Sequence, residues 1–333
     1  MILMVTNRRI RNGKYDDEEQ PNFGYHYLSG HKGGPQGNDG FLHRGRKPFQ
    51  RELHDELDRL HPAVCRTPKV GVYLHGYNND WQDSIDELVD LHDALEPALG
   101  YPPILIGFSW PSNGGVVGYL ADREEARDSV PALVRFLADI NTYLVKHEPQ
   151  CIATTFCVAH SMGNYVLRKG MEYLSDHLGT PIGRMMFSET VMLAPDLASG
   201  DLEVDGKGTY IAQFSRRVHV YYSPYDRALK ASSTKRFGGN RLGRHGPEHF
   251  DRLPGNVVAV NAERYANSKE MAGLSDRAGN QVSVHSSHRY HPAILADVAA
   301  VLSSVDRDQI LTREPFKLGD GTTPHARAHY VLK

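Results

Sequence analysis

The chain has 333 residues, of which 40% are apolar and 23% charged, and its formal net charge is −2. These values fit a soluble globular protein of one large or two small domains, and they exclude a general attraction to nucleic acid or to an acidic membrane. Three cysteines, Cys65, Cys151 and Cys157, are too few and odd in number for a disulfide framework. The apolar start is too short for a secretory signal and no run reaches the length of a membrane span, which predicts a cytoplasmic protein.

The first part of the chain is predicted to be mostly irregular. Residues 2–6 form an apolar run typical of a strand, whereas residues 8–68 are polar and rich in glycine. We expect 1–68 to be a strand and a long arm packed on the core, with at most a short helix near 50–60. The main domain is predicted at 69–312, and 313–333 is expected to be a polar tail on the surface.

From Val70 onward, apolar strands alternate with amphipathic helices. The strands are predicted at "VGVYLHG", "PILIGFSW", "CIATTFCVAH", "MMFSETVMLAP", "RVHVYYS" and "NVVAVNA", and the helices near 81–95, 130–144, 162–178 and 294–302. This alternation predicts an α/β fold in which a mostly parallel central sheet is covered by helices on both faces. In such sheets, active residues gather at the carboxyl ends of strands, where His75, Ser161 and Asp226 are found.

Ser161 is the candidate nucleophile. It lies in "CVAHSMGNYVL", between a predicted strand and a predicted helix, and the small residues Ala159 and Gly163 stand two positions to either side. A serine on a tight strand-to-helix turn needs small neighbours at these positions, and its hydroxyl is then exposed above the sheet. The helix N-terminus would also bring free N–H groups and a positive dipole end beside a developing oxyanion.

A nucleophilic serine requires a histidine base and a carboxylate that orients it, and on this type of turn they follow in the order serine, acid, histidine. Asp226, just after the strand "VHVYY", is the candidate acid, and Asp196 in "LAPDL" is its rival. His285, in a polar loop before the last helix, is the candidate base. His288 is the first alternative and His291 the second.

The oxyanion hole requires two backbone N–H groups. Met162, which follows the serine, supplies the first. The second is expected from the loop after "VYLHG", where Gly76 would let the chain pass close to the serine. Tyr77 is the candidate donor and Asn78 the alternative.

Taken together, these segments resemble a bacterial branch of the α/β-hydrolase superfamily. The blocks that carry the resemblance are "VYLHGYNNDWQDSIDEL", "GFSWPSNGG", "VAHSMGNYVL", "MLAPDL" and "YYSPYDRAL", and it extends over about 70–306. The branch is largely uncharacterised, and its members are usually called alpha/beta hydrolases or esterases. The resemblance implies a three-layer α/β-hydrolase fold and favours Asp226 over Asp196 as the acid.

The resemblance also bears on the histidine. Members of this branch carry Gly-His-Ser-Tyr shortly before a proline and the final helix, and alignment on Pro292 places that histidine at His285. This chain departs from the pattern, since Val284 replaces the glycine and Ser287 the tyrosine.

The predicted activity is hydrolysis of a carboxylic ester, or a related acyl substrate, through an acyl-enzyme intermediate. The expected substrate is a small-molecule ester, and neither a cofactor nor a metal is expected. Residues 8–68 and 235–256 are expected to line or cover the pocket and to determine the choice of substrate. The tyrosine-rich turns at Tyr77 and Tyr222–Tyr225 indicate either aromatic pocket walls or packing in the core. Three alternatives stay open. These are an acyltransferase with the same residues, a non-catalytic binding protein, and a metal-dependent hydrolase using the histidines of "HSSHRYH" and "HGPEHFD".

Overall fold

The computed structural model describes residues 1–31, 41–64, 68–112, 118–147, 154–178, 185–235 and 239–333. Its strands are β1 (Ile2–Thr6), β2 (Arg8–Arg11), β3 (Lys14–Glu19), β4 (His26–Gly30), β5 (Leu42–Arg44), β6 (Pro68–Leu74), β7 (Ile104–Ser109), β8 (Thr154–His160), β9 (Phe187–Leu193), β10 (Ser215–Tyr222), β11 (Val257–Asn261), β12 (Arg313–Pro315) and β13 (His329–Leu332). Its α-helices are α1 (Arg46–Val64), α2 (Trp81–Leu99), α3 (Tyr119–Asp128), α4 (Val130–His147), α5 (Gly163–Leu178), α6 (Thr209–Gln213), α7 (Arg227–Lys235), α8 (Leu242–His245) and α9 (Pro292–Leu302).

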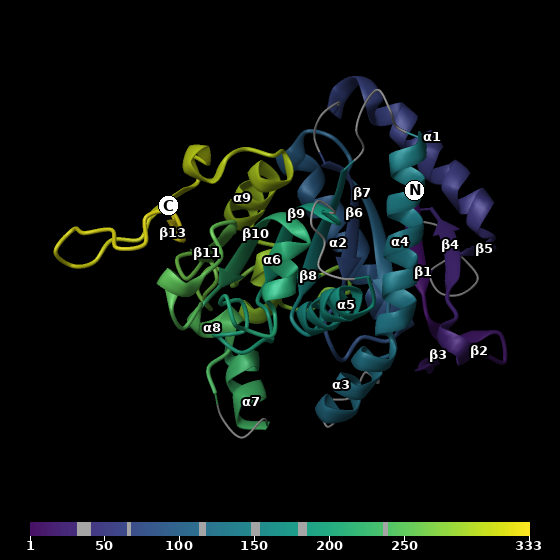
Figure 1. Ribbon diagram of the computed structural model, residues 1–333, viewed down its shortest axis with the longest axis horizontal. Helices are drawn as coiled ribbons and strands as arrows, with labels where there is room; N and C mark the ends of the chain where they lie inside the picture. Colours follow the sequence, from purple (N-terminus) through teal and green to yellow (C-terminus); the bar gives the residue numbers. More distant parts are fainter. Residues whose placement is uncertain (32–40, 65–67, 113–117, 148–153, 179–184, 236–238) are drawn as a thin grey trace.

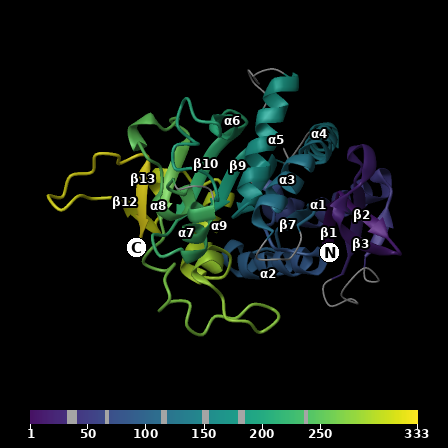
Figure 2. The ribbon, with the colours of Figure 1, turned by 90° about the horizontal axis from the view of Figure 1, so that it is seen from below.

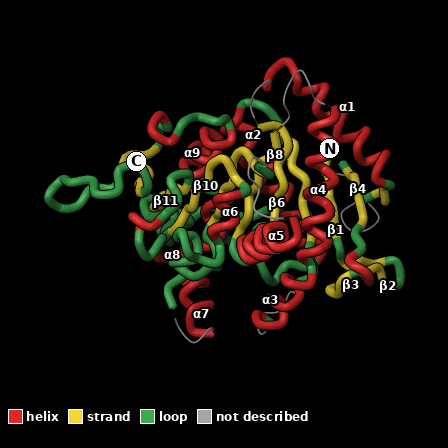
Figure 3. The backbone as a smooth tube through the Cα atoms, viewed as in Figure 1, coloured by secondary structure: helices red, strands yellow, loops and turns green. Residues whose placement is uncertain are grey.

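One large sheet forms the middle layer (Figures 1 and 3). Its strand order is β12-β13-β11-β10-β9-β8-β6-β7-β1-β4-β5, and the strands from β13 to β1 are all parallel to their neighbours. Only the edges are antiparallel, at β12–β13 and at β1–β4–β5. The predicted mostly parallel sheet is confirmed.

Helices cover both faces of this sheet, as Figure 2 shows. Alternate residues of each central strand point to opposite faces, so Val72 packs in the cluster with α1, α4 and α5, and Tyr73 packs in the other cluster with α2 and α9. The three-layer arrangement is therefore confirmed. None of the helices in the described residues is long and apolar enough to cross a membrane.

The N-terminal arm differs from the prediction of a long irregular segment. Within 8–68 the structure has four strands, β2 to β5, and α1 is longer than the short helix expected near 50–60. The hairpin β2–β3 turns at Asn12 and Gly13, whose φ angles of 52° and 76° are the positive values that a type I′ turn requires. Strands β2, β3 and β5 are short and mostly polar, and β4 has only two large apolar residues, Tyr27 and Leu28, so none of them has the continuous apolar run of a central strand.

The C-terminal tail also differs from the prediction. Both β12 and β13 extend the sheet, and β13 pairs in parallel with β11. Arg313, at the start of β12, is buried against Asp297 of α9, with its Nη2 atom 2.8 Å from Asp297 Oδ1. The buried ion pair therefore attaches the segment 313–333 to α9, although the polar composition of this segment alone predicts a tail on the surface.

Gly71, in the centre of β6, provides a test of this packing. A Cβ atom there would lie 2.3 Å from the ring of Phe156 and 2.6 Å from Leu105 Cδ2. We expect Gly71→Ala to lower the free energy of unfolding by about 2 kcal/mol, because overpacking a filled core displaces its neighbours. Urea denaturation measures this change. Gly319→Ala is the control, since nothing lies within 4 Å of its added Cβ, and a change within about 0.5 kcal/mol is expected there. An equal effect of the two substitutions would contradict the packing described.

Candidate active site

The candidate residues meet at the carboxyl edge of the sheet. The ends of β6, β8, β9 and β10 are in register there, with Leu74 opposite Ala159 and Ala159 opposite Met192. The loops that follow these strands surround a cavity of about 380 Å³. Its lining includes three predicted site residues, which are Tyr77, Ser161 and His285, and also the rival acid Asp196.

Ser161 lies on a strained turn between β8 and α5. Its φ angle is +51°, a left-handed value that is uncommon for any residue but glycine. The turn is held by hydrogen bonds from Ser161 N–H to Leu193 O (3.0 Å) and from Asp196 N–H to Ser161 O (3.1 Å). The side chain of Asn164 also donates to Ala159 O at 2.9 Å.

Two glycines allow this turn to lie against the end of β6. A Cβ atom on Gly163 would fall 2.3 Å from Leu74 O, which explains why α5 begins with glycine. A Cβ atom on Gly76 would lie 3.2 Å from the Cβ atom of Ser161, closer than nearly all ordinary contacts. The loop after β6 therefore passes directly beside the serine.

His285 and Asp226 form a buried pair. His285 comes from the short 3-10 helix η4 (Val284–Arg289), and Asp226 comes from the turn between β10 and α7. The Nδ1 atom of His285 donates to Asp226 Oδ2 at 2.6 Å, and the N–H of Leu229 donates to Asp226 Oδ1 at 2.9 Å. Asp226 is fully buried, whereas the His285 side chain is 16% exposed, so the ring has one nitrogen paired and one left for the cavity.

The pair shifts both pKa values. Burial alone would lower the pKa of His285, but the charge of Asp226 and its hydrogen bond outweigh burial and raise this pKa above 6.5. Burial alone would raise the pKa of Asp226, but the charge of His285 and the hydrogen bonds to it keep this pKa below 3.8. The carboxylate is therefore ionised throughout the physiological range, as an orienting acid requires.

The rival acid Asp196 has other partners. Its carboxylate accepts hydrogen bonds from Tyr119 Oη and Ser232 Oγ, both at 2.7 Å, and lies 3.5 Å from Arg241 Nε. These bonds connect α3 and α7 beside the cavity, so Asp196 forms part of its wall.

The alternative histidines are placed differently from His285. His288 is fully buried, and burial lowers its pKa to about 4. Its Nδ1 atom lies 3.4 Å from Ser287 Oγ. His291 caps α9, where its Nδ1 atom accepts from Ala293 N–H at 3.2 Å. Among the three, His285 has the hydrogen bond to Asp226.

The backbone N–H groups expected to form an oxyanion hole differ in whether they already have a hydrogen-bond acceptor. In the part of the chain that the structure describes, no hydrogen bond uses the N–H of Tyr77 or of Met162. The N–H of Asn78 instead donates to Ser112 Oγ at 2.7 Å. Asn78, the alternative donor, is therefore already engaged.

Two features of the cavity were not predicted from the sequence. The Nε2 atom of His160 donates to His285 O at 3.1 Å, and the two rings lie 4.9 Å apart. Burial lowers the pKa of His160 well below 6.5, so this ring is neutral and supports the loop that carries His285. Tyr119 packs edge-on against Tyr77, with ring centroids 5.7 Å apart. In the sequence, the only indication that His160 belongs to the site is its position directly before Ser161.

The regions expected to choose the substrate lie elsewhere. Tyr77 lines the cavity as expected, but Tyr222 is buried with its hydroxyl 2.8 Å from His329 Nε2, and Tyr225 is 55% exposed. The described residues of 8–68 and 235–256 are absent from the cavity lining. Its far wall is instead Ala228, Leu229 and Ala231 of α7, a helix that the sequence analysis did not identify.

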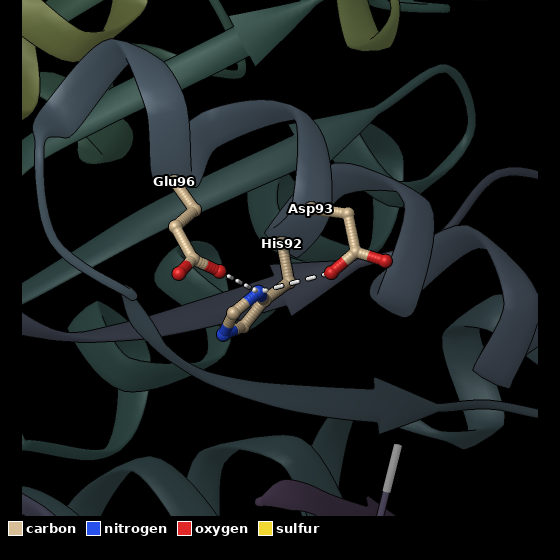
Figure 4. Close-up of side chains that lie close together, drawn as sticks. All are labelled: His92, Asp93 and Glu96. Carbon is tan, nitrogen blue, oxygen red and sulfur yellow. Dashed lines mark ion pairs between the residues drawn. The ribbon is translucent and has the colours of Figure 1, made fainter. Parts of the chain in front are cut away.

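Possible metal ligands lie close together at two places in the described residues. One is His92, Asp93 and Glu96 on α2, where His92 Nδ1 lies 3.5 Å from Asp93 Oδ1 and 3.8 Å from Glu96 Oε2 (Figure 4). The other is Glu203, Glu248 and His249. Neither group lines the cavity of Ser161. The second group shares His249 with the histidines of "HGPEHFD" considered from the sequence, whereas the first lies outside both sequence sets.

A comparison with curated proteins finds the uncharacterized protein alr1448 of Nostoc sp., which is 30% identical over 174 residues. The match covers 44% of this chain and 43% of that protein, so the chain spans less than half the length of this relative.

A comparison with solved structures finds, among others, three proteins that are described as hydrolytic enzymes. The phospholipase PlaB from Legionella pneumophila is 15% identical with a TM-score of 0.29, covering 49% of this chain and 41% of its own. The alpha/beta hydrolase LAE6 from the Lake Arreo metagenome is 12% identical with a TM-score of 0.37, covering 88% and 85%. Carboxyl esterase 2 from the fungus Tuber melanosporum is 12% identical with a TM-score of 0.33, covering 90% of each chain.

A family model with the description "Alpha/beta hydrolase of unknown function (DUF900)" matches residues 53–271, about two thirds of the chain. The matched range contains Tyr77, Ser161 and Asp226. It ends before His285, so the histidine of the buried pair is assigned from this structure and from the sequence pattern around it.

The partner of His285 can be tested by titration. In Asp226→Asn the pKa of His285 is expected to fall from above 6.5 to below it, because burial then acts without a neighbouring anion. Asp196→Asn is the matched control and should lower the pKa less. Histidine side-chain NMR measures both, with His285→Gln identifying the signal. A larger fall in Asp196→Asn would make Asp196 the partner.

Proposed function

The chain belongs to this family of alpha/beta hydrolases, and from that premise we propose that it is a serine hydrolase. It cleaves a carboxylic ester, or a related acyl substrate, through an acyl-enzyme intermediate. The observation that carries the proposal is the buried His285–Asp226 pair, which borders the same cavity as Ser161 on its strained turn.

The first half of the reaction uses the free nitrogen of His285. Because Nδ1 is hydrogen-bonded to Asp226, Nε2 is the atom that takes the proton from Ser161 Oγ. The serine oxygen attacks the acyl carbonyl, and the imidazolium that forms is stabilised by the ionised Asp226. His285 then protonates the leaving alcohol as the tetrahedral intermediate collapses.

The developing oxyanion is bound by the backbone N–H groups of Met162 and Tyr77. Each such donor contributes about 3 kcal/mol to transition-state stabilisation when it is fixed in place. The free state of both N–H groups within the described residues supports this role. Water then enters, His285 removes its proton, and the acyl group is released from Ser161.

The cavity favours a substrate with a neutral acyl group of modest size. Its volume is at the small end of the range for small-molecule pockets. Its walls are the rings of Tyr77 and Tyr119 and the small side chains of α7. The carboxylate of Asp196 in this lining is already paired with Arg241 and two hydroxyl groups, so it is not free to pair with a charged acyl chain.

Replacement of Ser161 is the first test. Ser161→Ala should lower kcat for short p-nitrophenyl esters on the order of a millionfold, because the remaining groups cannot form the acyl-enzyme. A fluorophosphonate probe should label the wild-type chain once, at Ser161, as read by peptide mass spectrometry.

Ser286→Ala is the control for this test, since Ser286 lines the same cavity without a place in the proposed mechanism. It should keep both labelling and activity. Activity of Ser161→Ala within tenfold of wild type would refute the proposal, and so would undiminished labelling of that variant.

The pH dependence gives a second test. His285 acts as a base only when neutral, and its pKa is raised, so kcat/KM should increase with pH through an apparent pKa above 6.5. Asp226→Asn should lower kcat by roughly 10⁴-fold, since the histidine loses the group that fixes its tautomer. An apparent pKa below 6 for this increase in the wild-type enzyme would contradict the assignment.

A further inference from the structure

Arg8 reaches the candidate site from a part of the chain outside the family match. β1 runs parallel to β7, so it ends at the same carboxyl edge as β6 and β8. The chain then turns into the hairpin β2–β3, which lies in the lower part of Figure 1, at the same end of the sheet as α3 and α7. Arg8 is the first residue of β2, and its side chain is turned inward and fully buried.

Each terminal nitrogen of the Arg8 guanidinium, and its Nε atom, has a partner. Nε donates to Ser109 Oγ at 2.9 Å, and Nη2 donates to the backbone O of Asn79 at 2.7 Å. Nη1 pairs with Asp17 Oδ1 at 2.5 Å. The planar fork of an arginine thus joins β3, the end of β7 and the loop after β6, which is a set of contacts that lysine cannot reproduce.

The loop that receives this contact carries Tyr77. At its start, His75 Nε2 accepts from Trp110 N–H at 3.1 Å, and Nδ1 therefore carries the proton that bonds Gly76 O at 2.7 Å. In its middle, Asn78 has a positive φ of 64° and donates to Ser112 Oγ. Arg8 holds the end of the loop at Asn79 O.

A positive φ at Asn78 is a strained conformation, which persists only where the surroundings hold it. Arg8 and Asp122 are charged members of these surroundings: Arg8 donates to Asn79 O, and Asp122 Oδ2 accepts from Asn78 N–H at 3.3 Å. Burial lowers the pKa of His75 to about 3, and the charge of Arg8 acts in the same direction, so the ring stays neutral and can accept from Trp110. Arg8 thus affects the loop on both sides of Tyr77.

From these contacts we propose that Arg8 is a positioning residue for the oxyanion hole. It fixes the loop 75–79 so that the N–H of Tyr77 points at the reacting carbonyl, although Arg8 itself touches no substrate. The inference rests on the serine hydrolase function proposed above. It assigns the N-terminal arm a part in catalysis, although the described residues of that arm are absent from the cavity lining.

The test compares Arg8→Met with Arg11→Met in the full-length chain. Arg8→Met should lower kcat about 10- to 100-fold, less than the loss expected for deletion of a donor, because Tyr77 N–H is misplaced and not removed. KM should stay within about twofold, since the hole acts on the transition state. Arg11→Met removes two ion pairs of the exposed Arg11 in the same hairpin, with Asp16 at 3.0 Å and with Glu18 at 3.1 Å, and should leave kcat within about twofold.

Two further readouts separate positioning from general destabilisation. The inhibition constant of an alkyl boronic acid, which forms a tetrahedral adduct with serine, should rise by about the same factor as kcat falls. The acid limb of the pH profile should be unchanged, because Arg8 does not contact the His285–Asp226 pair. Millimolar guanidinium should raise the kcat of Arg8→Ala at least about threefold over its value without guanidinium. NaCl at equal ionic strength should not raise it.

Should Arg8→Met fail to fold, Arg8→Lys and Asp17→Asn give the same comparison, with smaller losses of kcat at constant KM. The proposal is overturned if the folded Arg8 variants keep kcat within twofold of wild type, or if KM rises while boronate inhibition is unchanged. A wild-type chain that neither hydrolyses esters nor reacts with the fluorophosphonate probe would overturn the proposed function itself, before any Arg8 variant is measured.

Discussion

The close contact between the start of α5 and the end of β6 is the constraint on which the site depends. Only glycine fits at position 163, because any Cβ atom would collide with the backbone of Leu74. This contact brings the turn of Ser161 and Met162 against the loop of Tyr77, where a Cβ atom on Gly76 would lie only 3.2 Å from the Cβ atom of Ser161. The N–H groups proposed for the oxyanion hole come from opposite sides of this contact, so their relative position is set by backbone packing.

Buried charges are the second determinant of the site, and each has a partner. Asp226 is balanced by His285, Arg8 by Asp17, and Asp196 by Arg241 and two hydroxyl groups. Removal of one partner would leave an uncompensated charge in a low dielectric, which is strongly unfavourable. These pairs therefore fix the loops that the sheet edge alone would leave adjustable. The sheet edge places the groups of the candidate site, and the ion pairs orient the loops that carry them.

The sequence predicted what depends on periodicity and local turn chemistry. The buried strands β6 to β11 and the helices α2, α4, α5 and α9 have apolar patterns that define them, and Ala159-x-Ser161-x-Gly163 places the serine between strand and helix. The strands of the hairpin β2–β3 are short and polar and show no apolar run. Strands β12 and β13 depend on pairing with the distant β11, and helix α7 is short and mostly polar, so composition did not reveal them. The contact of Arg8 with Asn79 joins residues far apart in the chain, so no local sequence pattern could predict it.

The central claim is that Ser161, His285 and the N–H groups of Met162 and Tyr77 act on one carbonyl. A crystal structure of the chain after reaction with an alkyl phosphonate tests it most directly. The account predicts phosphorus bonded to Ser161 Oγ and a phosphonyl oxygen within hydrogen-bond distance of both N–H groups. His285 Nε2 should face the leaving-group position, and Arg8 should remain bonded to Asn79 O. An adduct on another residue, or a phosphonyl oxygen turned away from Tyr77 and Met162, would contradict the account.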